Sequence, residues 1–183
     1  MISMAIQDNS VSNKKVSLFE SINNDEKLEK YLDGIIDKTG NLIIDYLYES
    51  IGDFKDGLAI VSKSINAHES VYSYIDINGN ELPDTKKYNR VSNFSNGLAA
   101  VQHIGKWGYI DTKGKVIIPF MYNNANYFKN GVDWVTNIND ELGIINTRGE
   151  QVLPFINKKP VGIICEDIIL VLSEKKYGYI NTR

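Results

Sequence analysis

The chain has 183 residues, of which 43% are apolar and 23% charged, and its formal net charge is −3. This composition is that of an ordinary globular protein, and the length is sufficient for one domain or one repeat array without disulfide support. The weak negative charge argues against a protein that follows nucleic-acid phosphates, because such proteins carry a basic face. We therefore expect no nucleic-acid partner.

Residues 1–30 are predicted to form an N-terminal arm. Residues 1–15 are mostly small and polar, and residues 16–19 (VSLF) could form a short strand. Residues 23–31 (NNDEKLEKY) combine Asn and Asp caps with helix-forming residues, which predicts one or two helical turns. The segment lacks the charged and apolar regions of a signal peptide, and no apolar stretch is long enough to span a membrane. We expect a cytoplasmic protein with no membrane partner.

Residues 31–183 contain five similar segments. Each has an Asp or Asn in the same place, and these anchors lie 39, 35, 35 and 35 residues apart. They are Asp37, Asp76, Asp111, Asn146 and Asn181. A fixed period of this size is typical of a repeat architecture. We divide the region into repeats at about 31–70, 71–105, 106–140 and 141–175, followed by a partial repeat at 176–183.

The third segment predicts three strands per repeat, which we name strands A, B and C. In this segment they are residues 98–101, 107–111 and 115–118. The turn from Asp111 to Gly114 joins B to C, since Asp can bond the backbone two residues on and Gly accepts a positive φ. Pro119 has no N–H to donate and should end strand C. The turn glycine recurs as Gly40, Gly79, Gly114 and Gly149.

The connector from strand C to the next strand A contains an aromatic residue and a glycine. The pairs are Phe54 with Gly57, Phe94 with Gly97, and Phe128 with Gly131. We expect each phenylalanine to fill the gap between neighbouring repeats.

Strand B alternates between two faces, because successive side chains point to opposite sides of a sheet. One face always carries isoleucine and is predicted to be core: Ile36, Ile75, Ile110, Ile145 and Ile180. On the same face, two residues earlier, Gly34, Gly108, Gly143 and Gly178 should allow a close approach, and Ser73 departs from this pattern.

The other face of strand B, with Trp134 of a strand A, is rich in aromatic residues. The candidate binding face is Tyr72, Tyr74, Trp107, Tyr109, Trp134, Tyr177 and Tyr179. An exposed row of rings would bind a peptide, a protein or a glycan. Alternatively, the rings form a second hydrophobic layer that stacks one repeat on the next, which is the interpretation we favour.

Residues 106–122 (KWGYIDTKGKVIIPFMY) closely resemble the bacterial WG-repeat, or KWG-repeat, family, and the resemblance extends over residues 31–183. Other copies depart from the motif: Asp33, Tyr72, Leu142 and Tyr177 replace the Trp, and Ser73 replaces the Gly. The resemblance implies β-rich repeats and a binding or interaction role. It implies no catalytic residues.

The predicted fold is all-β: an array of about 35-residue, three-stranded antiparallel repeats stacked as a twisted open solenoid. The alternative is a closed, propeller-like ring in which residues 16–19 supply a third strand to the last repeat. That repeat stops in the middle of a hairpin, and an unpaired edge attracts pairing. We therefore expect that edge to bind a partner or to form a homodimer.

No residue combination indicates catalysis, a metal or a cofactor. His68 and His103 lie in separate turns, and Cys165 next to Glu166 and Asp167 is predicted to be a buried structural thiol. Each turn carries one acidic residue at most, too few for calcium. The expected function is a non-catalytic module for protein–protein interaction, with an immunity or effector-type role as its more specific form. The alternative is a cell-surface glycan-binding module.

Overall fold

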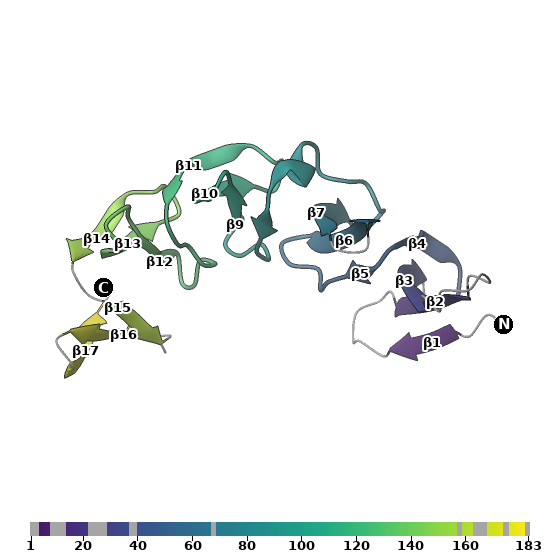
Figure 1. Cartoon of the computed structure of the whole chain (residues 1–183), viewed down its shortest axis with the longest axis horizontal. Helices are drawn as coiled ribbons and strands as arrows, with labels where there is room; N and C mark the ends of the chain where they lie inside the picture. Colours follow the sequence, from purple (N-terminus) through teal and green to yellow (C-terminus); the bar gives the residue numbers. More distant parts are fainter. Residues whose placement is uncertain are drawn as a thin grey trace. The chain divides into compact units, whose positions relative to one another are not determined.

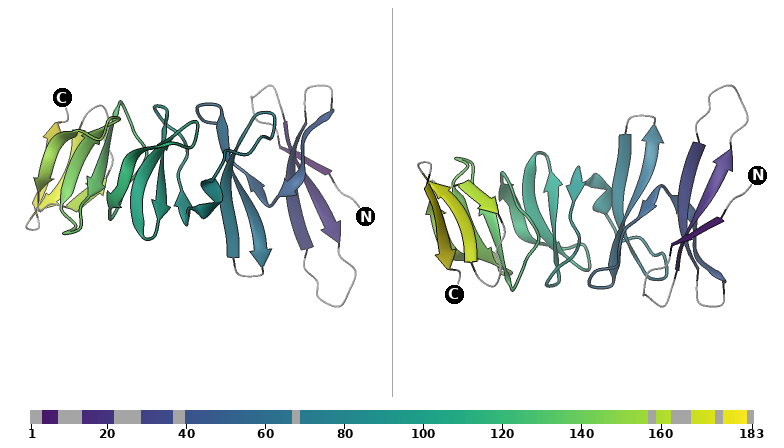
Figure 2. Two further views of the ribbon diagram at one scale, coloured as in Figure 1. Left: turned by 90° about the horizontal axis from the view of Figure 1, so that it is seen from above. Right: turned by 90° about the horizontal axis from the view of Figure 1, so that it is seen from below.

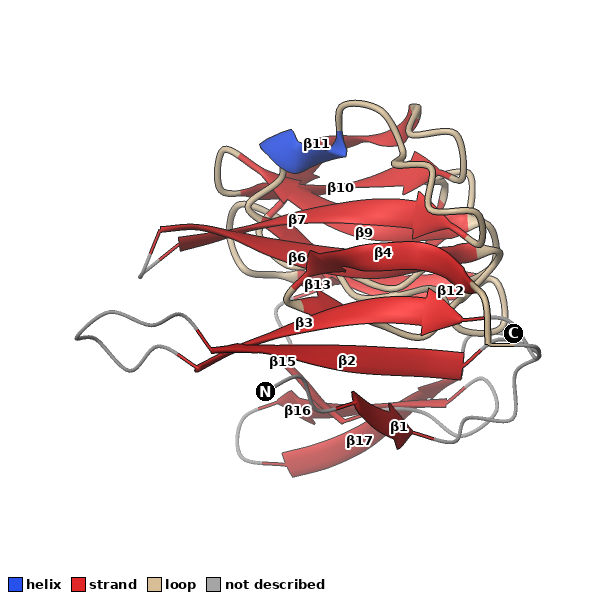
Figure 3. Ribbon diagram, turned by 90° about the vertical axis from the view of Figure 1, so that its right-hand side faces the viewer, coloured by secondary structure: helices blue, strands red, loops and turns tan. Residues whose placement is uncertain are grey.

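The computed structural model describes residues 4–7, 14–21, 29–36, 40–66, 69–156, 159–162, 168–173 and 176–181. The fold is all-β (Figures 1 and 3), and the described residues contain one short 3₁₀ helix, η1 (Thr85–Lys87). The strands form five small antiparallel sheets, each with a linear strand order. The chain divides into two compact units, unit 1 (Met1–Lys86) and unit 2 (Lys87–Arg183).

Unit 1 contains two sheets. The first has the order β1-β2-β3-β4 and the second the order β5-β6-β7. Their strands are β1 (Met4–Gln7), β2 (Lys14–Ser21), β3 (Glu29–Ile36), β4 (Leu42–Tyr48), β5 (Ser50–Ile51), β6 (Leu58–Asn66) and β7 (Glu69–Asp76).

Unit 2 contains three sheets, whose orders are β11-β10-β9-β8, β12-β13-β14 and β15-β16-β17 (Figure 2). Their strands are β8 (Arg90–Val91), β9 (Leu98–His103), β10 (Lys106–Asp111), β11 (Val116–Tyr122), β12 (Val132–Thr136), β13 (Leu142–Asn146), β14 (Gln151–Ile156), β15 (Lys159–Gly162), β16 (Ile168–Ser173) and β17 (Lys176–Asn181). The all-β class and the array of small antiparallel repeats are therefore confirmed.

The segment expected to be an arm is paired within the first sheet. The strand predicted at residues 16–19 is the longer β2, which pairs with β3 along its whole length and with β1 on its other side. It thus takes the place of strand A beside strand B of the first repeat, and both of its edges are already paired. The helix predicted at 23–31 is wrong for its last three residues, which lie in β3; residues 22–28 lie outside the described residues.

Strand C does not end at its proline. β11 continues through Pro119 to Tyr122, so the predicted end is wrong. The register shifts between the pair Trp107 and Tyr122 and the pair Tyr109 and Ile118, which marks a bulge on an edge strand. A proline is tolerated there because the ladder does not need its missing N–H. The close approach predicted for glycine is confirmed at this bulge, where a Cβ on Gly108 would lie 2.7 Å from the backbone oxygen of Ile118.

The turns from strand B to strand C form as predicted. The Oδ1 atom of Asp111 accepts hydrogen bonds from the backbone N–H groups of Lys113 and Lys115, both at 2.9 Å. The turn glycine Gly114 has a φ of 81°. Asp76 and Asn146 accept the same pair of bonds, so the uncharged amide does the work of the carboxylate. Asp37 and the side chain of Asn181 lie outside the described residues.

The core extends over both faces of strand B. The predicted isoleucine face is confirmed by Ile75, Ile110 and Ile145, which are all fully buried. The opposite face is buried as well, because the connector phenylalanine covers it. The ring of Phe128 lies 4.9 Å from the ring of Tyr109, in a cluster that joins the third and fourth repeats. Phe54 packs in the same way between the two sheets of unit 1, so the predicted role of these rings is confirmed.

Candidate functional site

The aromatic face predicted from sequence is not a single exposed surface. Tyr74 and Tyr109 are fully buried, whereas Tyr72 is 38% and Tyr179 76% exposed. Trp107 and Trp134 are half-buried and pack against core clusters, and the side chain of Tyr177 lies outside the described residues. Tyr109 and Trp107 therefore belong to a hydrophobic cluster that joins two repeats, whereas Trp134 packs within its own sheet.

A buried acid, which sequence reasoning missed, lies against one of these tyrosines. The Tyr109 hydroxyl donates a hydrogen bond of 2.5 Å to Oδ2 of Asp133, and the backbone N–H of Asn126 donates to the same atom at 2.9 Å. Asp133 stands two residues after the connector glycine, where other repeats have Ala59 and Ala99. An acidic residue at a position that is alanine in other repeats was the sequence signal that could have revealed this buried acid.

The protonation of this pair follows from its burial. Asp133 is 4% exposed, and burial raises its pKa to about 7, although its hydrogen bonds with Tyr109, Asn126 and the backbone of Trp134 oppose the change. Burial, followed by the nearby Asp133, raises the pKa of the Tyr109 hydroxyl above its usual value. Both side chains are buried, and their hydrogen bond joins two repeats.

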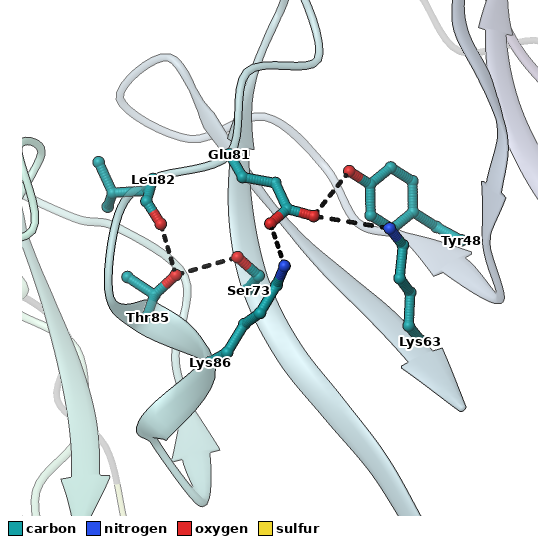
Figure 4. A network of polar contacts seen from close by, with 7 residues as sticks. All are labelled: Tyr48, Lys63, Ser73, Glu81, Leu82, Thr85 and Lys86. Atoms are coloured by element: carbon teal, nitrogen blue, oxygen red, sulfur yellow. Dashed lines mark hydrogen bonds and ion pairs between the residues drawn. The ribbon is translucent and has the colours of Figure 1, made fainter. Parts of the chain in front are cut away.

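A second polar network lies in unit 1 (Figure 4). The Glu81 carboxylate accepts a hydrogen bond from the Tyr48 hydroxyl at 3.3 Å and pairs with Lys86 at 2.5 Å and Lys63 at 3.6 Å. Burial opposes ionisation of Glu81, but the two ammonium groups outweigh it and hold its pKa below the usual value. Burial and the adjacent carboxylate raise the pKa of Tyr48 to about 12.

This network lies where the first, third and fourth repeats have strand C. The second repeat has no full strand C among the described residues, and its chain pairs with β7 only around Glu81 and Leu82 before it enters η1. The Ser73 hydroxyl lies 3.0 Å from that of Thr85, which donates to the backbone oxygen of Leu82 at 2.9 Å. The network therefore has a structural role.

The histidine that the structure describes is explained by packing. The ring of His103 lies 6.1 Å from that of Tyr88 and 5.5 Å from that of Phe120. His68 and Cys165 lie outside the described residues. The described part of the chain contains no group of three or more side chains suited to hold a metal ion. Nor does it contain a helix long and apolar enough to cross a membrane.

Exposed apolar side chains recur on strand C. The fifth and tenth residues after the turn anchor are Leu42 and Leu47 in β4, which are 46% and 55% exposed. In β11 the same positions are Val116 and Met121, which are 40% and 56% exposed. Ile117 and Val152 add further exposed apolar groups to these strands. We name Leu42, Leu47, Val116, Ile117, Met121 and Val152 the C-strand side chains.

The backbone beside these side chains is poorly suited to accept another strand. β4, β11 and β14 are edge strands, and the eighth residue after the anchor is Asp45, Pro119 or Pro154. Proline offers no N–H, and Asp45 accepts the N–H of Tyr46 at 2.8 Å. Such residues protect an edge against strand pairing. The C-strand side chains are therefore available for contacts that do not extend the sheet.

The comparisons with known proteins agree with the repeated fold. A family model described as WG containing repeat matches residues 34–64, 72–107 and 107–139, which together cover more than half of the chain. A comparison with curated proteins finds no match. The matched segments include strand B of the first three repeats, with Gly34, Ser73 and Gly108.

Proposed function

The chain belongs to the WG-repeat family, and on that basis we propose that it is a non-catalytic β-repeat module that binds a protein partner through the C-strand side chains. The observation that carries the proposal is the exposure of apolar groups at the same two positions of β4 and β11. Scattered single apolar residues are normal on a surface, but their recurrence at equivalent positions of two repeats favours a binding role.

The mode of contact follows from the edges of these strands. Asp45, Pro119 and Pro154 each remove or occupy a backbone donor, so a partner gains little from adding a strand. Apolar side chains of the partner would instead cover the C-strand side chains. Such burial contributes about 25 cal/mol for each Å² of apolar surface removed from water.

The test is a pull-down with matched baits. The wild-type chain should capture a specific protein from the source lysate, and the double variant Val116→Asp/Met121→Asp should not. Ile65→Asp, which alters a residue on β6 that is 57% exposed, is the control and should capture as well as the wild type. No captured protein at micromolar bait, or equal capture by all three baits, would remove the proposal.

A more specific form of this function is an immunity or effector-type role, in which the module blocks one partner. A cytoplasmic location fits the single cysteine, since thiols stay reduced there. This blocking role is tested by identifying the captured protein and assaying its activity with and without the module. An unchanged activity would reject the blocking role but leave binding intact.

Glycan binding is the alternative function. The observation that favours it is the exposure of Tyr72 and Tyr179, since an exposed ring can stack on a sugar. A glycan array tests it directly. Binding that is lost on Tyr179→Ala would support this function, and an array without hits would eliminate it.

Self-association through the last sheet is a further proposal of this kind. Among the described strands, β17 is paired on one side only, with β16. Its sequence (KYGYIN) has neither a proline nor an aspartate to protect the outer edge. Tyr179→Pro would remove a backbone N–H donor from β17, and any dimer formed through this edge should weaken.

A further inference from the structure

The turn between β9 and β10 contains a residue that the turn does not favour. Ile104 and Gly105 form this two-residue turn with φ values of 47° and 74°. Both positions lie in the left-handed region, where Asn-Gly and Asp-Gly are preferred and a β-branched residue is strained. Moreover, Ile104 is 82% exposed, so it adds nothing to the core.

The same chain shows what such a turn ordinarily uses. Three other tight turns place Asp56, Asn96 or Asn130 before glycine, with φ values of 50°, 54° and 52°. Each has a short side chain that tolerates this conformation. Ile104 therefore favours neither the turn nor the core, and strain of this kind often marks functional positions.

A second exposed isoleucine lies at the next hairpin tip of unit 2. Ile138 is 74% exposed in the turn between β12 and β13. The Oδ1 atom of Asn137 stabilises this turn by accepting the N–H groups of Asn139 and Glu141, at 2.9 and 3.0 Å. Since those bonds do not involve the side chain of Ile138, the turn does not require it.

One asparagine links the two tips. The Lys106 ammonium group, next to the first tip, lies 2.5 Å from Oδ1 of Asn123. The Nδ2 atom of Asn123 donates to Oδ1 of Asp140, in the second tip, at 2.8 Å. The two tips, each with its exposed isoleucine, are thus neighbours joined through Asn123. We name Ile104, Lys106, Ile138 and Asp140 the tip pair.

The tips carry opposite charges. Residues 87–110 contain Lys87, Arg90 and Lys106 and no acidic residue. The backbone of Lys87 lies against His103, and Arg90 pairs with Gln102, so these basic residues flank the first tip. Residues 131–147 contain three acidic residues, of which Asp140 and Glu141 lie at the second tip, and no Lys or Arg.

We propose that the tip pair is a self-association surface, at which two copies of this chain meet about a two-fold axis. In such an arrangement the same patch is used on both copies. The basic tip of one copy faces the acidic tip of the other, and each Ile104 packs against Ile138 of the second copy. This charge self-complementarity selects a second copy as the occupant. The tip pair uses residues other than the C-strand side chains and adds a property to the proposed function.

The first experiment is sedimentation velocity of the whole chain over a wide range of concentrations. The wild type should form a dimer that dissociates as salt is added, because its exposed charges are screened. Ile104→Asn should weaken the dimer at least about tenfold, since it removes an apolar contact. The same variant should raise the melting temperature, because Asn accepts the left-handed conformation.

These opposite changes in association and stability separate a binding role from a structural one. Ile65→Asn, at a residue that is 57% exposed in unit 1, is the control and should dimerise as the wild type does. A wild type that stays monomeric at low salt would overturn the proposal. So would an Ile104→Asn variant that dimerises normally.

A charge exchange tests the two-fold arrangement. Lys106→Glu and Asp140→Lys should each lose the dimer formed through the tip pair when alone, because like charges then face each other across the axis. An equal mixture should form a heterodimer, because each copy again meets an opposite charge. A mixture that stays monomeric would overturn the arrangement. None of these variants alters the C-strand side chains, so the pull-down with the wild type and Val116→Asp/Met121→Asp remains an independent test of the proposed function.

Discussion

The second and third repeats differ at one small residue and at one strand. In the third repeat Gly108 lies under β11, and a Cβ there would meet the backbone oxygen of Ile118 at 2.7 Å. In the second repeat Ser73 takes that position, and no full strand C forms among the described residues. Its hydroxyl bonds Thr85 instead, and the chain turns into η1.

The other repeats follow the same rule. Gly34 and Gly143 lie under β4 and β14, where a Cβ would be 2.8 Å from the oxygen of Ile44 and 2.7 Å from the ring of Phe155. In the first, third and fourth repeats, strand C is therefore present where strand B offers a glycine at this position. The comparison teaches that a bulged edge strand needs the space that a missing side chain leaves.

The largest effect should come from adding a methyl group at the third repeat. Gly108→Ala should lower the free energy of unfolding by about 4 kcal/mol, because the obstacle is backbone and cannot rotate away. Urea denaturation measures this value. Ala59, buried in a strand A without such a contact, gives the control Ala59→Gly, which should cost about 1 kcal/mol. Equal losses would contradict the proposed role of the glycine.

Asp133, at the junction between the third and fourth repeats, should make the free energy of unfolding depend on pH. Its pKa is about 7 in the folded chain against 3.8 for a free side chain. The folded state therefore holds a proton that the unfolded state releases between these values. Stability from this group is present below pH 4 and is lost as pH rises through 7, by about 4 kcal/mol.

Thermal melts from pH 4 to pH 8 measure this loss. Asp133→Asn keeps an oxygen for the bonds from Tyr109 and Asn126 but cannot ionise. Its pH profile should therefore lack this decline. A wild type and an Asn variant with parallel profiles would show that Asp133 does not titrate in this range.

Replacing Asp133 by an apolar residue should lower the free energy of unfolding only moderately, although the side chain is buried. Asp133→Ala introduces the residue found at the equivalent positions Ala59 and Ala99, but it leaves the buried Tyr109 hydroxyl without its partner. We expect a loss of about 2 kcal/mol. Tyr109→Phe added to Asp133→Ala should recover most of this, because both polar groups are then gone. A double variant as unstable as the sum of both single variants would contradict the pairing.

The turn assignment predicts a smaller difference. Gly114→Val should lower the free energy of unfolding by about 2 kcal/mol, because a β-branched residue is strained at a φ of 81°. Lys113→Ala, one residue earlier on the exposed turn, should change it by less than about 0.5 kcal/mol. Equal melting temperatures for the two variants would refute the assignment.

The smallest effect should come from the second repeat. Ser73→Ala removes the hydrogen bond with Thr85 but keeps the Cβ, so we expect a loss of about 1 kcal/mol. Ser73→Gly should not create a strand C, since the residues that follow form η1 and the Glu81 network. A shift of hydrogen-exchange protection into residues 81–88 of the Gly variant would show that the glycine alone is sufficient.

The sequence by itself determined the repeat period, the turns and the family. These features are local or periodic. The Asp and Gly of each turn act within five residues, and Ile110 and its counterparts repeat with the strand. The departure at Ser73 was visible too, although its consequence for strand C was not.

Only the tertiary structure decided which surfaces remain exposed. Alternation assigned Tyr74 and Tyr109 to one face, but whether a connector covers that face depends on packing between repeats. The pairing of β2 with β3 also depends on the tertiary structure, because no local pattern connects these two segments. Pro119 is tolerated within β11 because that strand lies at the edge of its sheet. Burial and pairing are properties of distant contacts, and a single sequence does not state them.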